Sequence, residues 1–234
     1  MQTPADSTNS GATANGNSPS PWHAGEKQLQ RRFGVAGKME EFGRKVIRDF
    51  MPEQHREFYR QLPFMLLGTV DANGHPWATL LEGTPGFARS PDPRTLQVNT
   101  RLQSTDPAAP ALSEGAPVGL LGIELHTRRR NRINGHIHRY DNAGLSIAVE
   151  HAFGNCQLRQ FERLPEPDNN NATAERQDGL DEQARRMIQT ADTFFVASYF
   201  THSDGRVSVD VSHRGGRSGF VQVQGNRLSI PDFA

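Results

Sequence analysis

Two segments of this chain repeat one pattern about 131 residues apart. The first, FMLLGTVDANGHPWATLLEGTPGFARSPDPRTLQVNT, begins at Phe64, and the second, FVASYFTHSDGRVSVDVSHRGGRSGFVQVQGNRLSIPD, begins at Phe195. Each contains an alternating strand, a tight turn with glycine, a second strand, the dipeptide Gly-Phe and a third strand. Self-similarity at a fixed spacing indicates a duplicated unit. The chain is therefore expected to be mainly β and to contain two related parts.

The first part continues beyond the shared pattern. A short helix is expected in TDPAAPALSEG, a buried strand in PVGLLGIEL, and two alternating strands in RINGHIHRY and GLSIAVEHAF around the turn DNAG. Residues 62–162 are thus predicted to form six strands that close into a small barrel, which removes exposed edges. The second part, residues 181–234, starts with a helix in LDEQARRMIQTA and stops after its third strand, so we expect a partial second copy.

Three further segments flank these parts. Residues 1–21 consist of small and polar residues with almost no apolar bulk, which predicts a disordered tail. Residues 22–61 are expected to form a helical N-terminal arm, and residues 163–180 a polar linker rich in Pro and Asn. The helical spacing is carried by four apolar residues: Phe42, Val46, Ile47 and Phe50.

The overall composition excludes several classes of protein. The 26 basic and 26 acidic residues balance, whereas a general nucleic-acid binder is usually basic. No apolar run approaches the roughly 20 residues that span a bilayer, and the N-terminus lacks the features of a secretory signal. The single cysteine, Cys156, allows no disulfide within the chain and fits a reducing compartment. The cytoplasm is the expected location, with no nucleic-acid or membrane partner.

Positive charge is concentrated at one bend between two expected strands. Four arginines lie within the five positions 128–132. Guanidinium groups this close repel one another unless an anion lies among them. A phosphate is one such anion, because arginine binds it through two parallel hydrogen bonds. A solvated turn with incidental charge is the alternative interpretation, since charge runs usually face water.

The motifs of both parts resemble those of one known family. DANGHP, GLLGIEL and RRNRING in the first copy, and SHRGGRSGF and LSIPDFA in the second, resemble the pyridoxamine 5′-phosphate oxidase-like FMN-binding split-barrel family. SPWHAGE and FGNC resemble a subgroup with two tandem barrels, which is often followed by ferredoxin-reductase-like and iron–sulfur domains. At the position of the family's flavin-contacting glutamine, this chain has Arg130.

The resemblance implies a fold, a cofactor and a function. The fold would be a six-stranded split β-barrel with N-terminal helices and a partial second copy, and the function that of an FMN-binding protein, an oxidoreductase in which the flavin performs the redox chemistry. Family members look like dimers with flavin between two barrels, so a homodimer is expected, and a reductase or iron–sulfur protein could be a partner. The alternative is a non-catalytic flavin-binding or interaction module that serves a reductase. No catalytic acid or base can be assigned.

The same resemblance implies a site at the seam between the two copies, where Ser212 would offer a hydroxyl and the RGGR glycines would let backbone N–H groups approach the ligand. The expected cofactor-binding residues are Arg129, Arg130, Arg132, Ser212, His213, Arg214, Arg217 and Asp232.

Other residues are weaker candidates. His136 and His138 could hold haem or a metal from one strand face, although no third ligand is visible. Cys156 could be a reactive thiol or a packed small residue. Trp22 and His23 could anchor the N-terminal arm or border the flavin.

Overall fold

A computed structural model describes residues 20–124, 127, 129–155 and 177–231. The chain divides into two compact units, the first ending at Lys45 and the second beginning at Val46. Cys156, Arg128, Asp232 and almost all of the predicted tail and linker lie outside the described residues. Within the described ranges, no helix combines the length and apolarity that crossing a bilayer requires.

The first unit is a pair of short helices, α1 (Ala24–Arg32) and α2 (Ala36–Val46). His23 caps α1, because its side chain accepts hydrogen bonds from the backbone N–H groups of Gly25 and Glu26. The Trp22 indole donates to the Met39 carbonyl at 2.9 Å, which ties the start of this segment to α2. The prediction of helices here is confirmed.

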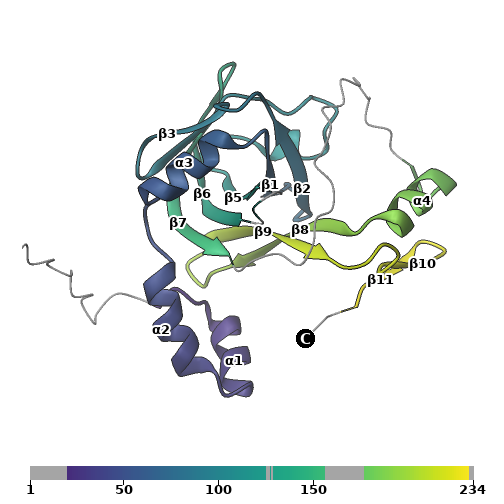
Figure 1. Ribbon diagram of the computed structural model, residues 1–234, viewed down its shortest axis with the longest axis horizontal. Helices are drawn as coiled ribbons and strands as arrows, with labels where there is room; N and C mark the ends of the chain where they lie inside the picture. The colour runs from purple at the N-terminus through teal and green to yellow at the C-terminus, as the bar shows by residue number, and fades with distance from the viewer. Residues whose placement is uncertain (1–19, 125–126, 128, 156–176, 232–234) are drawn as a thin grey trace, which may run out of the picture. The chain divides into compact units, whose positions relative to one another are not determined.

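The second unit opens with helix α3 (Glu53–Gln61), followed by seven strands in one antiparallel sheet. The strand order is β2-β1-β5-β6-β7-β4-β3 (Figure 1). The bounds are β1 Phe64–Val70, β2 Pro76–Glu82, β3 Ala88–Asp92, β4 Thr95–Val98, β5 Pro117–Glu124, β6 Arg129–Asp141 and β7 Gly144–Asn155. One core receives side chains from all seven strands and from α3, so the sheet wraps around it.

The mainly β fold is confirmed, but two details of the prediction are wrong. The sheet has seven strands rather than six, because the segment before the expected third strand forms β3 and pairs with β4. The turn between them lies at Pro93 and Arg94, where the Asp92 side chain accepts a hydrogen bond from Arg94 N at 2.8 Å. The expected helix in TDPAAPALSEG is a single 3₁₀ turn, Ala109–Ala111.

The later segment forms helix α4 (Glu182–Thr190) and two hairpins. Strands β8 (Thr193–Thr201) and β9 (Val207–Gly215) pair with each other, as do β10 (Gln222–Gln224) and β11 (Arg227–Ser229). The order of elements, one helix followed by two hairpins, is the order in which α3 and β1–β4 occur.

The turns of the β1–β2 and β8–β9 hairpins have the same backbone hydrogen bonds. In the first, Asp71 N donates to His75 O and Gly74 N donates to Asp71 O. The second repeats both bonds 131 positions later: His202 N to Arg206 O and Gly205 N to His202 O. The left-handed φ of Gly74, 79°, recurs at Gly205, 83°. These shared details support the predicted duplication, which stays an interpretation.

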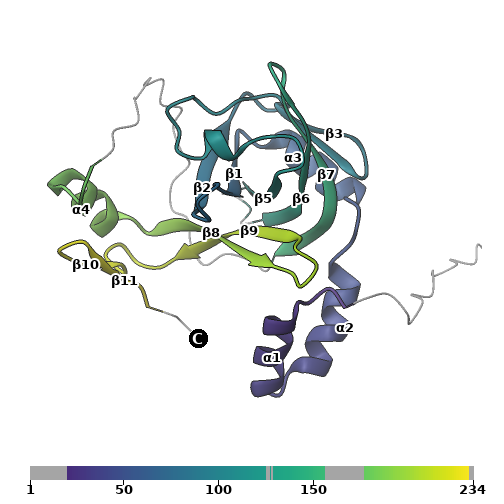
Figure 2. The ribbon, with the colours of Figure 1, turned by 180° about the vertical axis from the view of Figure 1, so that it is seen from behind.

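The β8–β9 hairpin packs against the outer face of the barrel, as Figures 1 and 2 show from opposite sides. Leu66, Leu121 and Ile123 of the barrel form a second apolar cluster with Val211 of β9, and Phe64 and Phe195 pack on it. Two glycines that face each other across β1 and β5, Gly68 and Gly119, let the β9 backbone approach closely.

Candidate functional site

Alternation along β6 divides its polar side chains between two faces. Asn131 and Ile133 are buried on the core side, whereas Arg130, Arg132 and Asn134 are only partly buried on the other side. Arg132 and Asn134 both bond to β9, so this second face is the one that meets the hairpin. The fold thus turns two of the predicted arginines toward the second part of the chain.

An ion pair joins the two parts. Arg132 Nη1 lies 2.7 Å from Asp210 Oδ2, and Asn134 Nδ2 donates to the Val209 carbonyl at 2.5 Å. Burial raises the pKa of Asp210, although the charge of Arg132 opposes this, and burial also lowers the pKa of Arg132. Arg132 Nε is buried and has no hydrogen-bond partner within the described structure, so this guanidinium retains a donor for a further group.

The charges of three guanidinium groups act on one imidazole. Burial, together with the charges of Arg130, Arg214 and Arg132, lowers the pKa of His213 to about 4. His213 is therefore neutral at pH 7. Arg214 Nη1 donates to Ser212 Oγ and to the His213 carbonyl, both at 3.1 Å. We call Arg130, Arg132, Arg214, Ser212 and His213, together with Asp210, the arginine cluster.

The arginine cluster has the charge of an anion site. At neutral pH it carries three positive charges and one negative charge, and Ser212 supplies a hydroxyl. An anion there would contact groups from both β6 and β9. Sequence reasoning missed Asp210. It could have been found as an acidic residue in the middle of a strand, between two apolar residues, Val209 and Val211, that are buried in the structure.

Two of the remaining predicted residues, Arg129 and Arg217, are not among the groups of the cluster. By alternation along β6, Arg129 lies on the opposite face from Arg130 and Arg132, and its guanidinium lies 5.3 Å from the Phe58 ring centroid. Arg217 is exposed in the loop after β9, and Asp232 lies outside the described residues. His136 Nδ1 lies 3.3 Å from Glu150 Oε1, and a register shift between Ile137 and Arg139 interrupts the alternation that would align His138 with His136.

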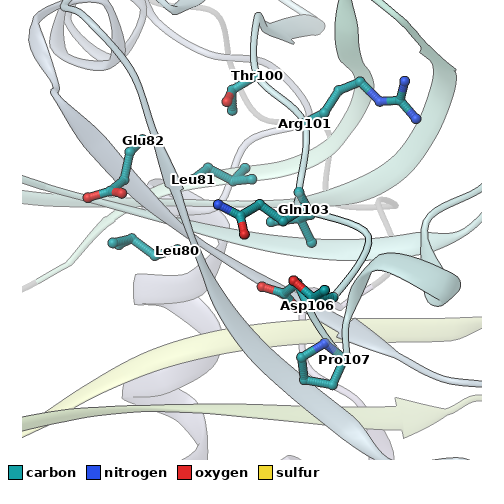
Figure 3. A pocket seen from close by; sticks show the side chains of 10 residues that line it. Leu80, Leu81, Glu82, Thr100, Arg101, Gln103, Asp106 and Pro107 are labelled. Atoms are coloured by element: carbon teal, nitrogen blue, oxygen red, sulfur yellow. The ribbon is translucent and has the colours of Figure 1, made fainter. Parts of the chain in front are cut away.

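A cavity that the sequence did not indicate opens beside β2. Its volume is about 440 Å³, within the range of small-molecule sites. Figure 3 shows the side chains that line it. One wall is the end of β2, and the other is the irregular segment that follows β4. The lining residues are Leu80, Leu81, Glu82, Thr100, Arg101, Leu102, Gln103, Thr105, Asp106 and Pro107. Asp106 is held in place because it accepts a hydrogen bond from Thr79 Oγ1 at 2.5 Å.

This cavity and the arginine cluster are separate. Leu80 pairs with Leu66, Leu66 with Leu121, and Leu121 with Arg132. Three strand spacings therefore separate Leu80 from Arg132, roughly 14 Å along the sheet. The cavity wall carries two acidic side chains and one basic one, whereas the cluster is rich in arginine. The two places differ in the ligand chemistry that they suit.

The family model for pyridoxamine 5′-phosphate oxidase matches residues 51–174. The chain belongs to the pyridoxamine 5′-phosphate oxidase family. The match spans helix α3 and all seven strands of the barrel sheet, so the resemblance carried by the motifs of the first copy is confirmed. Within the family's barrel, the arginines at 130 and 132 lie on the outer face of β6.

Two solved structures of HupZ from Group A Streptococcus are similar to part of the chain. One, a histidine-to-alanine variant, is 15% identical, covers 45% of this chain and 99% of its own, and has a TM-score of 0.35. The other is 16% identical, covers 44% and 94%, and has a TM-score of 0.34. No curated protein matches the chain. The family assignment rests on the family model.

Proposed function

We propose that the protein binds FMN, with the phosphate held at the arginine cluster, and acts as a flavin-dependent oxidoreductase in the cytoplasm. The observation that carries the proposal is the convergence of β6 and β9. The charges of Arg130, Arg132 and Arg214 act on the buried imidazole of His213. Strands β6 and β9, which carry these residues, are about 80 residues apart in the chain.

The residues present fit a phosphate. The guanidinium of Arg132 has a buried Nε that lacks a hydrogen-bond partner in the described part of the chain, and Ser212 is nearly buried beside Arg214. Each charge-assisted hydrogen bond to a phosphate contributes on the order of 1.5–3 kcal/mol. Asp210 offsets one of the three positive charges, which leaves an excess suited to a doubly charged phosphate.

The bound flavin would supply the redox chemistry, while the chain would hold and orient it. Arg130, Arg132 and Arg214 would bind the phosphate, with Ser212 as a further donor. His213 would stay neutral at pH 7 and would add no charge. A homodimer and a reductase or iron–sulfur partner stay predictions from the family resemblance.

An absorbance scan of the freshly purified protein tests for bound flavin, and an FMN titration locates it. Arg214→Ala and Arg130→Ala are each expected to weaken FMN binding at least tenfold, about 1.4 kcal/mol. Arg206→Ala is the matched control, because Arg206 lies on the same hairpin but pairs with Asp204 in the turn. Unchanged titrations with both cluster variants would show that the site is wrong.

A further variant separates the cluster from the cavity beside β2. Gln103→Trp fills that cavity with a bulky ring and is expected to leave FMN binding unchanged. If Gln103→Trp abolishes binding while the arginine variants bind normally, the flavin sits in the cavity instead. The absorbance of bound flavin after addition of NADH or NADPH shows whether the flavin is reduced. Reduction indicates an oxidoreductase, and its absence indicates the alternative, a non-catalytic flavin-binding module.

A further inference from the structure

Within the part of the chain that the structure describes, strand β8 pairs with one strand, whereas β1, the strand that it matches, pairs with two. The β8–β9 register reproduces that of β1–β2 with every residue 131 positions later: Phe64 pairs with Glu82, and Phe195 pairs with His213. Strand β1 also pairs along its other edge with β5, through Met65–Gly68. Within the described residues, β8 pairs with β9 alone, so its second edge has no partner strand.

Matched residues of β1 and β8 also differ in burial. Met65 is fully buried, whereas Val196, 131 positions later, is 37% exposed. Tyr199, which matches Gly68, is 42% exposed. In β1 every residue from Met65 to Thr69 is buried, whereas Ala197 is the one buried residue of β8. The second hairpin thus leaves apolar side chains of β8 exposed, whereas the matched residues of β1 are buried in the barrel.

The composition of β8 also sets it apart from the two edge strands of the barrel sheet, β2 and β3. A strand edge that faces water is normally protected by charge, proline or a bulge, because its free N–H and C=O groups invite pairing with another strand. Strand β2 carries Pro76 and Glu82, and β3 carries Arg89, Pro91 and Asp92 with a register shift. The nine residues of β8, TFFVASYFT, include no charge and no proline.

We propose that the free edge of β8 is an acceptor for an added antiparallel strand, and that its partner is an extended apolar segment with the pattern of β5. Main-chain hydrogen bonds along the edge would supply affinity, and alternate side chains would supply specificity. A β5-like segment fits for one reason: β8 matches β1 in hairpin register, and β1 pairs with β5 along its other edge. This inference does not depend on flavin binding.

The probe is a fluorescent peptide with the sequence of β5, PVGLLGIE, extended by two lysines for solubility. Added to the full chain, it should give a saturable rise in fluorescence anisotropy and slow the hydrogen exchange of the β8 amides. A peptide that is N-methylated at alternate residues keeps the side chains but cannot form the ladder, and it should bind at least tenfold more weakly. A scrambled peptide is the composition control.

Two protein variants locate the binding. Val196→Asp places a charge on the acceptor strand and should weaken peptide binding at least tenfold. Met187→Asp makes the same change at an exposed apolar residue of α4 and should bind the peptide normally. Binding that N-methylation or Val196→Asp leaves unchanged would overturn the proposal. The proposal would also be overturned if the protein is a dimer that does not bind the peptide and whose β8 amides are already protected from hydrogen exchange. A second copy of the chain would then be the partner.

Discussion

The two long hairpins of this protein share a backbone and differ in their surroundings. β1–β2 and β8–β9 have the same register, the same turn hydrogen bonds and a left-handed glycine at the same place. Even the loop that follows is shared: Phe87 N donates to Thr84 O, and 133 positions later Phe220 N donates to Arg217 O, both at 2.9 Å. Yet β1 is buried along most of its length, and β8 is not.

The comparison separates local from long-range causes. A turn and a register depend on residues close together in the chain, such as Gly74 and Asp71 in the first hairpin. Burial depends on strands that arrive from elsewhere, here β5 beside β1. The outer faces of the two hairpins meet around Leu66 and Val211, so each covers part of the other.

The largest effect is expected where the β9 backbone crosses the barrel. A Cβ at Gly119 would lie 2.7 Å from Val209 O and 2.9 Å from Asp210 Cα. Both are backbone atoms of β9, which cannot move aside as the end of a flexible side chain can. Gly119→Ala should therefore lower the free energy of unfolding by about 2–3 kcal/mol, as overpacking does. Gly68→Ala meets the Val211 side chain at 3.2 Å and should cost less. Urea denaturation measures both; equal costs would mean that the hairpin does not rest on Gly119.

A smaller effect should distinguish the two Gly-Phe loops. A Cβ at Gly83 would lie 2.6 Å from Phe87 Cβ, and at Gly216 2.7 Å from Phe220 Cγ. Phe87 belongs to the barrel core, whereas Phe220 is partly exposed and stacks on Phe194 at 5.9 Å. Gly83→Ala should cost about 1–2 kcal/mol, and Gly216→Ala less, because Phe220 has room to move. Thermal denaturation of the two variants would contradict this if Gly216→Ala were the more damaging.

Periodic features of the fold could be predicted from the sequence, and irregular ones could not. The alternation of apolar residues and the turn glycines predicted the β1–β2 and β8–β9 hairpins and the strands β5 to β7. Strand β3 was missed because Pro91 and Pro93 read as loop, although an edge strand tolerates proline. The cavity beside β2 was missed because one wall is an irregular segment, residues 100–107, which carries no period.

The candidate site was predictable in part, for the same reason. The density of arginine indicated an anion, and the repeat suggested that β6 and β9 would share a site. Alternation along β6 could also have shown that Arg129 faces away from Arg130 and Arg132. The pairing of Arg132 with Asp210 could not be foreseen, because it depends on how the hairpin crosses the barrel.

The smallest effect concerns the acidic residue in each turn. Asp71 Oδ1 accepts hydrogen bonds from Asn73 N and His75 N, both at 2.9 Å, and Oδ2 accepts from the Trp77 indole at 3.0 Å. Among the described residues, Asp204 accepts hydrogen bonds from the backbone N and the Nε of Arg206. Asp71→Asn turns an amide N–H toward the indole N–H and should lower Tm by a few degrees, more than Asp204→Asn does.

The pH dependence of the Asp71 effect gives a second measurement. The hydrogen bond from Trp77, followed by that from His75 N, lowers the pKa of Asp71 to about 2 in the folded protein. The unfolded chain has a pKa near 3.9 for this group. A lowered pKa stabilises the fold above pH about 4, and that contribution disappears as the pH falls toward about 2. The difference in Tm between wild type and Asp71→Asn should therefore shrink over this interval; a difference independent of pH would mean that the ionised carboxylate is not what holds the turn.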